Sequence, residues 1–82
     1  MFSAESFGQR LKQVRKVKGQ KQEELGVAIG VGKSQISELE RGTASTTLEK
    51  LSLICQYYNV SADYLLGLTD EPKPYKRKHP KK

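Results

Sequence analysis

The 82-residue chain has no tryptophan, only one cysteine and only one histidine. A disulfide needs two cysteines, so Cys55 cannot form one within the chain, and no Cys/His cluster has the spacing of a zinc site. The N-terminus lacks the apolar segment of a signal peptide, and no apolar run is long enough to span a bilayer. These absences predict a soluble cytoplasmic protein that holds no metal and no cofactor.

Residues for catalysis are also scarce. The one histidine, His79, lies near the C-terminus, and no pairing of a nucleophile with a base can be assembled from the rest of the chain. We therefore expect that the protein is not an enzyme and has no catalytic residues.

Positive charge is abundant but unevenly placed. The chain carries 15 basic and 9 acidic residues, a formal net charge of +6. All of this excess lies from Pro72 to Lys82, where there are no acidic residues, so the rest of the chain is formally neutral. We expect a folded domain over residues 1–69 and a disordered basic tail over 70–82, which serves either as a nonspecific phosphate arm or as a solubilising end.

Apolar residues recur at helical spacing in five short segments, and no segment shows the alternation of a strand. The pattern predicts helices from near Ser3 to before Gly19, over 22–29, over 33–41, from about 48 to 58 and a last turn after Ser61. For the fourth helix the N-cap is Thr46, in a capping box with Glu49, or else Thr47. Its expected inward stripe comprises Leu48, Leu51, Ile54, Cys55 and Tyr58.

The second and third helices are separated only by Gly30-Val31-Gly32, which is too short for an independent loop. The third helix must therefore pack across the second, as in a DNA-reading helix-turn-helix. At about 100° per residue, Ile36 and Leu39 face inward. The residues on the opposite, outer face are Lys33, Ser34, Ser37 and Glu38. An ordinary solvated helix face has the same composition, so the face by itself does not establish DNA binding.

Three stretches together resemble the Cro/C1-type, or Xre-family, helix-turn-helix of bacterial and phage repressors. They are FGQRLKQVRKVKG, QEELGVAIGVGKSQISELERG and TLEKLSLICQYYNVSADYLLG, within residues 6–68. The resemblance implies a compact all-α, five-helix, lambda-repressor-like domain that binds a double-stranded DNA operator. It departs from the usual family pattern at Lys21, Gly26 and Gly32, where a hydroxyl cap, an alanine and another hydroxyl cap are more common.

The resemblance also implies roles for individual residues. Those expected to read base edges are Lys33, Ser34, Ser37 and Glu38, and those expected to contact phosphate are Gln22 and Arg41. Two further phosphate candidates come from their charge and not from the family pattern: Lys21 is a cation near the expected phosphate path, and Arg10 lies on the basic face of the first helix. A solvated basic face is the open alternative for Arg10. Arg15 and Glu40 match a structural ion pair of the family. Glu40 lies at the border of the apolar face of its helix, where an unpaired carboxylate would be costly, and this supports the same pairing.

By the same analogy we expect a homodimer on an inverted-repeat operator, with Tyr57, Leu66 and Leu68 as candidate contact residues. A bacterial or phage repressor is the favoured function. An antitoxin with a toxin partner, or a controller of restriction-modification genes, would use the same DNA module. A protein-interaction adaptor without DNA binding is a further alternative, favoured by the neutral domain and by Glu38.

Overall fold

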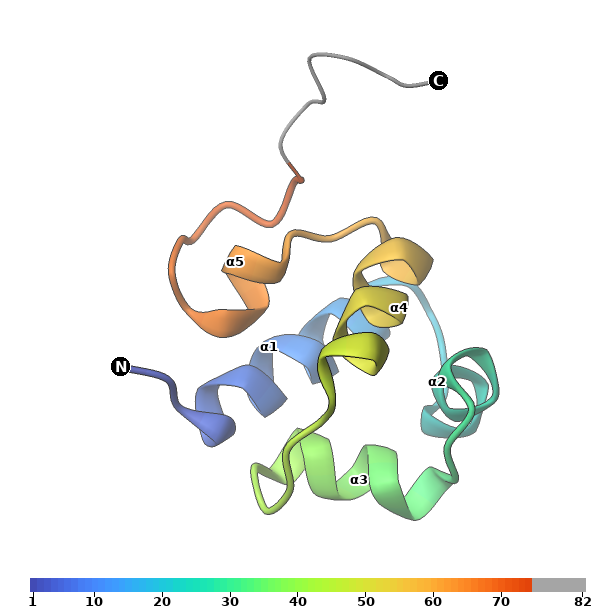
Figure 1. The fold of residues 1–82 in the computed structure, drawn as a ribbon. Coiled ribbons are helices and arrows are strands. Elements are labelled where there is room, and N and C mark those ends of the chain that lie inside the picture. Colours follow the sequence, from blue (N-terminus) through green and yellow to red (C-terminus); the bar gives the residue numbers. More distant parts are fainter. Residues whose placement is uncertain (75–82) are drawn as a thin grey trace.

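The computed structural model describes residues 1–74 and contains five helices (Figure 1). They are α1 (Ala4–Val17), α2 (Gln22–Ile29), α3 (Lys33–Arg41), α4 (Leu48–Tyr58) and α5 (Ala62–Leu66). Residues 1–74 contain no strand, so the all-α prediction is confirmed for this part of the chain. None of these helices combines the length and apolar character needed to cross a membrane.

Side-chain caps set where most of the helices begin. The hydroxyl of Ser3 accepts a hydrogen bond from the Ser6 N–H at the start of α1, and Ser61 does the same for Tyr64 in α5. In α4 the cap is Thr47, which accepts from the Lys50 N–H. The capping box of Thr46 with Glu49 was therefore wrong, because the helix begins one residue later than that pairing requires.

Ten buried side chains from α1 to α5 and the α4–α5 link form one core. They are Phe7, Leu11, Leu25, Ile29, Ile36, Leu39, Ile54, Tyr58, Val60 and Leu65. Leu51 and Cys55 pack against this core, but Leu48 does not. Leu48 is 85% exposed because it is the first residue of α4, one turn before the inward stripe begins, so its predicted burial was wrong.

Helix α1 lies between α3 on one side and α5 on the other, and it contacts both (Figure 1). Helix α2 packs against α3 and α4. Helix α3 consequently lies at the edge of the molecule, with one face on the core and the other toward solvent.

The segment that follows α5 returns to the domain. We call residues 69–74 the strap. Arg10 donates hydrogen bonds of 2.7 Å to the carbonyls of Tyr64 and Thr69 and one of 2.8 Å to the Asp70 carboxylate. The Ser61 N–H donates to the Pro72 carbonyl at 2.8 Å. A free tail from residue 70 was expected, but Asp70 and Pro72 are bonded to the domain. The rest of the predicted tail, 75–82, lies outside the described residues.

Candidate DNA interface

The turn between α2 and α3 depends on glycine. Gly30 ends α2 in the left-handed conformation, with φ of 80°, which side chains with a Cβ adopt only under strain. Gly26 lies against the turn itself, since a Cβ there would come within 2.6 Å of the Val31 carbonyl oxygen. The replacement of the usual alanine at Gly26 therefore goes with a close approach of the backbone.

The outer face of α3 is polar. Lys33, Ser34 and Glu38 are exposed, while Ser37 is half-buried and lies beside Arg41. The Arg41 guanidinium donates a hydrogen bond of 2.5 Å to the Ser37 hydroxyl. Within residues 1–74 neither Lys33 nor Glu38 forms a salt bridge, so both charges are available to a ligand.

This face and the start of α2 form one shallow, open concavity of about 390 Å³. Its lining consists of Gln22, Lys33, Ser34, Ser37, Glu38 and Arg41. All four predicted base-reading residues and two of the four predicted phosphate contacts therefore lie together. The concavity offers cationic, amide, hydroxyl and carboxylate groups over a small area, which suits hydrogen bonding to base edges and phosphates.

Below the concavity, the expected ion pair of Arg15 with Glu40 is present and both side chains are buried. Arg15 donates to the two carboxylate oxygens at 2.6 and 3.0 Å. The hydrogen bond to Glu40 is the main reason that the pKa of Arg15 is raised, against the lowering effect of burial. The pair joins α1 to the last turn of α3 and so holds the orientation of the outer face.

Gln22 connects this ion pair to the surface. Its side-chain N–H donates to Glu40 at 3.0 Å, while the residue itself lines the concavity. An amide has two N–H groups and a carbonyl, so this one bond leaves further hydrogen-bonding capacity for a phosphate. The side chain of Gln22 is thereby oriented before any ligand arrives.

The other two predicted phosphate contacts lie elsewhere. Lys21 is exposed immediately before α2, and its backbone N–H donates to the Glu24 carboxylate at 2.7 Å. Arg10 is committed to the strap and lies 4.4 Å from the centre of the Tyr64 ring. Its guanidinium is therefore held against α5 and the strap, and the structure gives no support to a phosphate contact by Arg10.

Two features that position α3 were missed from the sequence. Gly8 allows α1 to touch α3, because a Cβ there would come within 2.6 Å of the Glu40 carbonyl oxygen. Gln20 links α1 to α4, since its carbonyl accepts from Arg15 at 2.7 Å and its side-chain oxygen accepts from the Tyr58 hydroxyl at 3.0 Å. For Gly8 the sequence did offer a signal, because this glycine lies on the apolar stripe of α1 between Phe7 and Leu11. For Gln20 it offered none.

Within residues 1–74, no three side chains of His, Cys, Asp or Glu are grouped so that they could hold a metal ion.

One relative of this chain is named as a transcriptional regulator and another as an antitoxin. The chain is 41% identical over 68 residues to the uncharacterized HTH-type transcriptional regulator YobD of Bacillus subtilis, covering 83% of this chain and 61% of YobD. It is 33% identical over 61 residues to the antitoxin PezA of Streptococcus pneumoniae, covering 74% of this chain and 39% of PezA. The chain thus spans less than two thirds of the length of either relative.

Two solved structures have the same fold. The P22 c2 repressor in complex with a synthetic operator superposes with a TM-score of 0.70 and 33% identity, over 73% of this chain and 91% of the repressor. The restriction-modification controller protein C.AhdI of Aeromonas hydrophila gives a TM-score of 0.70 and 29% identity, over 76% and 94% of the two chains. The lambda-repressor-like architecture is therefore confirmed.

The profile of the HTH_3 helix-turn-helix family matches residues 11–65, which include the concavity, the glycine turn and the Arg15–Glu40 pair. The Cro/C1-type resemblance is thus confirmed, and the chain belongs to the HTH_3 helix-turn-helix family.

Proposed function

We propose that this chain is a transcriptional regulator that binds double-stranded DNA in a sequence-specific manner, with α3 in the major groove. The observation that carries the proposal is the concavity lined by six polar residues of α2 and α3. The P22 c2 repressor, which shares the fold, is described in complex with an operator. A rigid polar helix at the edge of a small domain has the size and shape that the major groove admits.

Within this proposal the contacts divide into two kinds. Gln22, Lys21 and Arg41 contact phosphates at the two ends of the helix pair, assisted by the N–H groups that begin α2. Lys33 donates to guanine, and Glu38 accepts from the amino group of cytosine. Because Glu38 is repelled by phosphates, it also disfavours sites at which no such amino group faces it.

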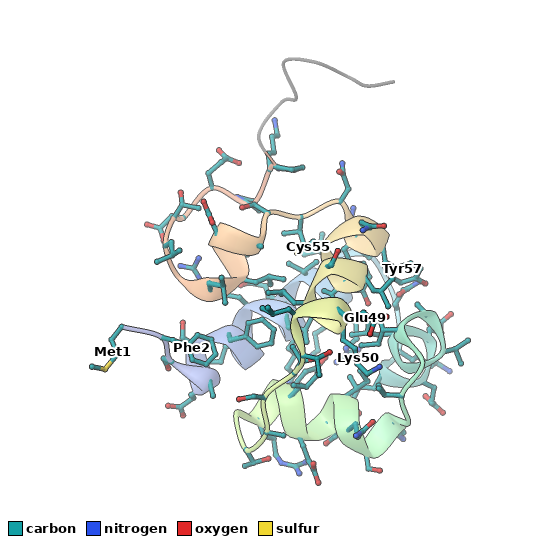
Figure 2. All side chains as sticks on the ribbon, viewed as in Figure 1. Met1, Phe2, Glu49, Lys50, Cys55 and Tyr57 are labelled. Atoms are coloured by element: carbon teal, nitrogen blue, oxygen red, sulfur yellow. The ribbon has the colours of Figure 1, made fainter. Side chains whose placement is uncertain are left out.

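The protein would act as a homodimer on an inverted repeat, with two copies of α3 about 34 Å apart. An apolar hollow supports a dimer surface that includes Leu66, which lines it together with Phe2 and Leu48. Leu68 is 72% exposed. Tyr57 lies on the opposite side of the molecule from Phe2 in Figure 2, so we place the dimer contact around Leu66 and Leu68 and not at Tyr57.

Repression of transcription in the cytoplasm of a bacterium or of a phage host is the favoured biological role. Blocking polymerase requires only that the domain occupy its operator. PezA is an antitoxin and C.AhdI is a restriction-modification controller, so either role is the alternative for this chain with the same DNA module. A neighbouring toxin or restriction gene would distinguish these two roles from simple repression.

The decisive test is selection of bound duplexes from random DNA with the full chain. We expect an enriched inverted repeat with half-sites about 34 Å apart, bound with an affinity that falls linearly with the logarithm of salt concentration. A scrambled duplex of the same composition is the control. Failure to enrich any sequence, or an affinity that does not change with salt, would contradict the proposal and favour a protein-interaction adaptor.

A further inference from the structure

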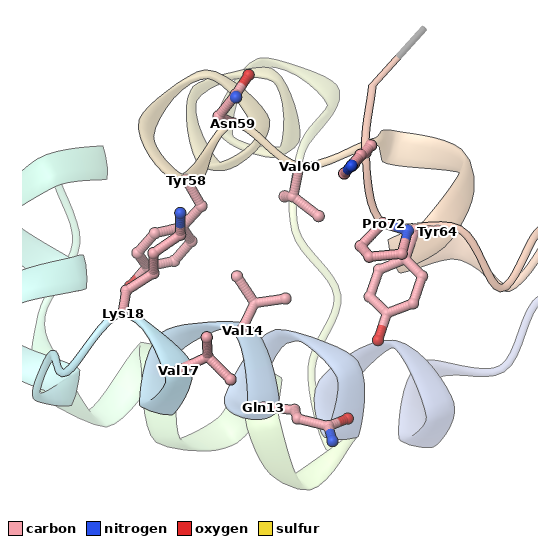
Figure 3. A pocket seen from close by; sticks show the side chains of 10 residues that line it. Gln13, Val14, Val17, Lys18, Tyr58, Asn59, Val60, Tyr64 and Pro72 are labelled. Carbon is pink, nitrogen blue, oxygen red and sulfur yellow. The ribbon is translucent and has the colours of Figure 1, made fainter.

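An open cavity of about 280 Å³ lies on the opposite side of α1 from α3, and the strap borders it on one side (Figure 3). Its apolar walls come from α1, from the α4–α5 region and from the strap itself. They are formed by Val14, Val17, Tyr58, Val60, Tyr64 and Pro72. The cavity is separate from the concavity of the candidate DNA interface, with which it shares no lining residue.

Three of these walls are held in place by interactions outside the cavity. The Tyr58 hydroxyl donates to Gln20, and the Tyr64 ring lies under the Arg10 guanidinium. Pro72 is anchored through its carbonyl, which accepts from the Ser61 N–H at 2.8 Å. The cavity is therefore formed before any ligand binds, which lowers the cost of ordering it on binding.

The polar part of the lining consists of the neutral residues Gln13 and Asn59 and two lysines, so its charged part is cationic. Lys18, at the end of α1, and Lys73, in the strap, both contribute to it, and none of the ten described lining residues is acidic. Neither lysine forms a salt bridge to any residue among 1–74. The nearest acidic residue in sequence, Glu71, accepts a hydrogen bond from the backbone N–H of Lys73 and is not part of the lining.

We propose that this cavity binds a small organic anion with one carboxylate and a compact aromatic or branched apolar body. The body would contact the valine, tyrosine and proline walls, and the carboxylate would lie between Lys18 and Lys73. A volume of about 280 Å³ is near the lower end of the range for ligand pockets, so the ligand must be small. A neutral ligand of the same shape would leave the two ammonium groups unmatched.

The test uses two acids, 3-phenylpropionate and 4-methylpentanoate, and the neutral control 3-phenylpropanamide. Each is titrated into the full ¹⁵N-labelled chain, and backbone amide shifts are followed by NMR. We expect saturable shifts at Val14, Val17 and Val60 for the acids, with a Kd below about 5 mM, and at least threefold weaker binding of the amide. Absence of saturation with both acids, or equal affinity for acid and amide, would overturn the proposal.

Variants locate the site. Val17 is 79% exposed, so Val17→Phe is expected to leave the fold intact and to fill part of the cavity, which should abolish binding of both acids. Lys18→Gln and Lys73→Gln should each weaken the acids at least twofold and leave the amide unchanged. Lys12→Gln, an exposed lysine of α1 outside the lining, is the matched control. Unchanged binding in Val17→Phe would place the probes elsewhere and overturn the assignment.

The ligand proposal does not depend on DNA binding. Its readout is the NMR titration, which needs no operator, and each variant is checked for its thermal unfolding midpoint. Saturable binding without operator affinity would leave this site standing and remove the proposed function. Operator affinity without probe binding would remove the ligand site and leave the proposed function standing.

Discussion

The guanidinium of Arg15 and the carboxylate of Glu40 are joined by two hydrogen bonds, of 2.6 and 3.0 Å, across 25 positions of the sequence. The side chains are 8% and 3% exposed, so neither charge has access to water that could replace its partner. Gln22 and the Gln20 carbonyl bond to the same pair. The orientation of α3 therefore depends on a buried polar group and not only on apolar packing.

Glu40→Ala should lower the free energy of unfolding by about 3 to 5 kcal/mol, because it leaves the Arg15 guanidinium buried without its partner. Urea unfolding followed by circular dichroism measures the loss. The double variant Arg15→Met/Glu40→Leu should recover most of it, since the pair is then replaced by apolar groups of similar size. A double variant as unstable as Glu40→Ala would show that the cost comes from packing, or from the Gln20 carbonyl and the Gln22 amide that lose their partners, and not from the unpaired charge.

Gly8→Ala should destabilise the domain by at least about 2 kcal/mol, because its Cβ would meet the backbone of α3, which cannot move aside as a side chain can. The adjacent exposed change Gln9→Ala is the control and should stay within about 0.5 kcal/mol. Thermal unfolding compares the two. Similar midpoints for both variants would mean that α1 and α3 tolerate a wider separation than the structure shows.

Lys33→Ala should weaken binding to the selected operator and relax the preference at one base pair by about 1 to 3 kcal/mol. Gln22→Ala should weaken operator and random DNA alike, because a phosphate contact carries no sequence information. Fluorescence anisotropy with both duplexes measures the ratio. Lys73→Ala, in the strap, is the charge-matched control for Lys33 and should keep the preference. Equal losses on both duplexes for Lys33→Ala would remove its assignment to base readout.

Arg10→Ala should release the strap, since one guanidinium bonds two backbone carbonyls and the Asp70 carboxylate. Hydrogen exchange at the Ser61 N–H, which donates to Pro72, should become at least tenfold faster, a change of about 1.4 kcal/mol in local stability. Asp70→Asn should change it much less, because the Asp70 side chain is 98% exposed and surface ion pairs contribute about 0 to 1 kcal/mol. An unchanged exchange rate in Arg10→Ala would show that the strap is held by other contacts.

Burial raises the pKa of Tyr58 to about 12 from its ordinary value of 10.0, with a smaller contribution from Tyr57. The folded state therefore retains the phenolic proton more strongly than the unfolded state does. The resulting stabilisation is complete below pH 10 and should be lost as the pH rises from 10 to 12. Urea unfolding across this window should show a shallower loss for Tyr58→Phe than for the parent chain. Equal slopes would indicate that Tyr58 titrates normally in the folded protein.

Helix boundaries at the centre of the domain were predictable because local chemistry sets them. The limits of α2 and α3 match the predicted ranges 22–29 and 33–41, since Gly30 and Gly42 adopt left-handed conformations that end each helix. The outer face of α3 followed from helical spacing. The start of α4 was not fixed by local chemistry alone, because Thr46 and Thr47 can both cap a helix and only the folded chain distinguishes them.

The sequence by itself determined the helices, the glycine turn and the polar face of α3, because each depends on residues within one or two helical turns of one another. The tertiary structure decided the role of Arg10, which bonds a carbonyl 59 positions away, and the close approach of Gly8 to α3. It also decided that the strap returns to the domain and lines an open cavity together with α1. Such contacts join segments far apart in the chain, and their partners are selected by packing geometry, which helical periodicity does not contain.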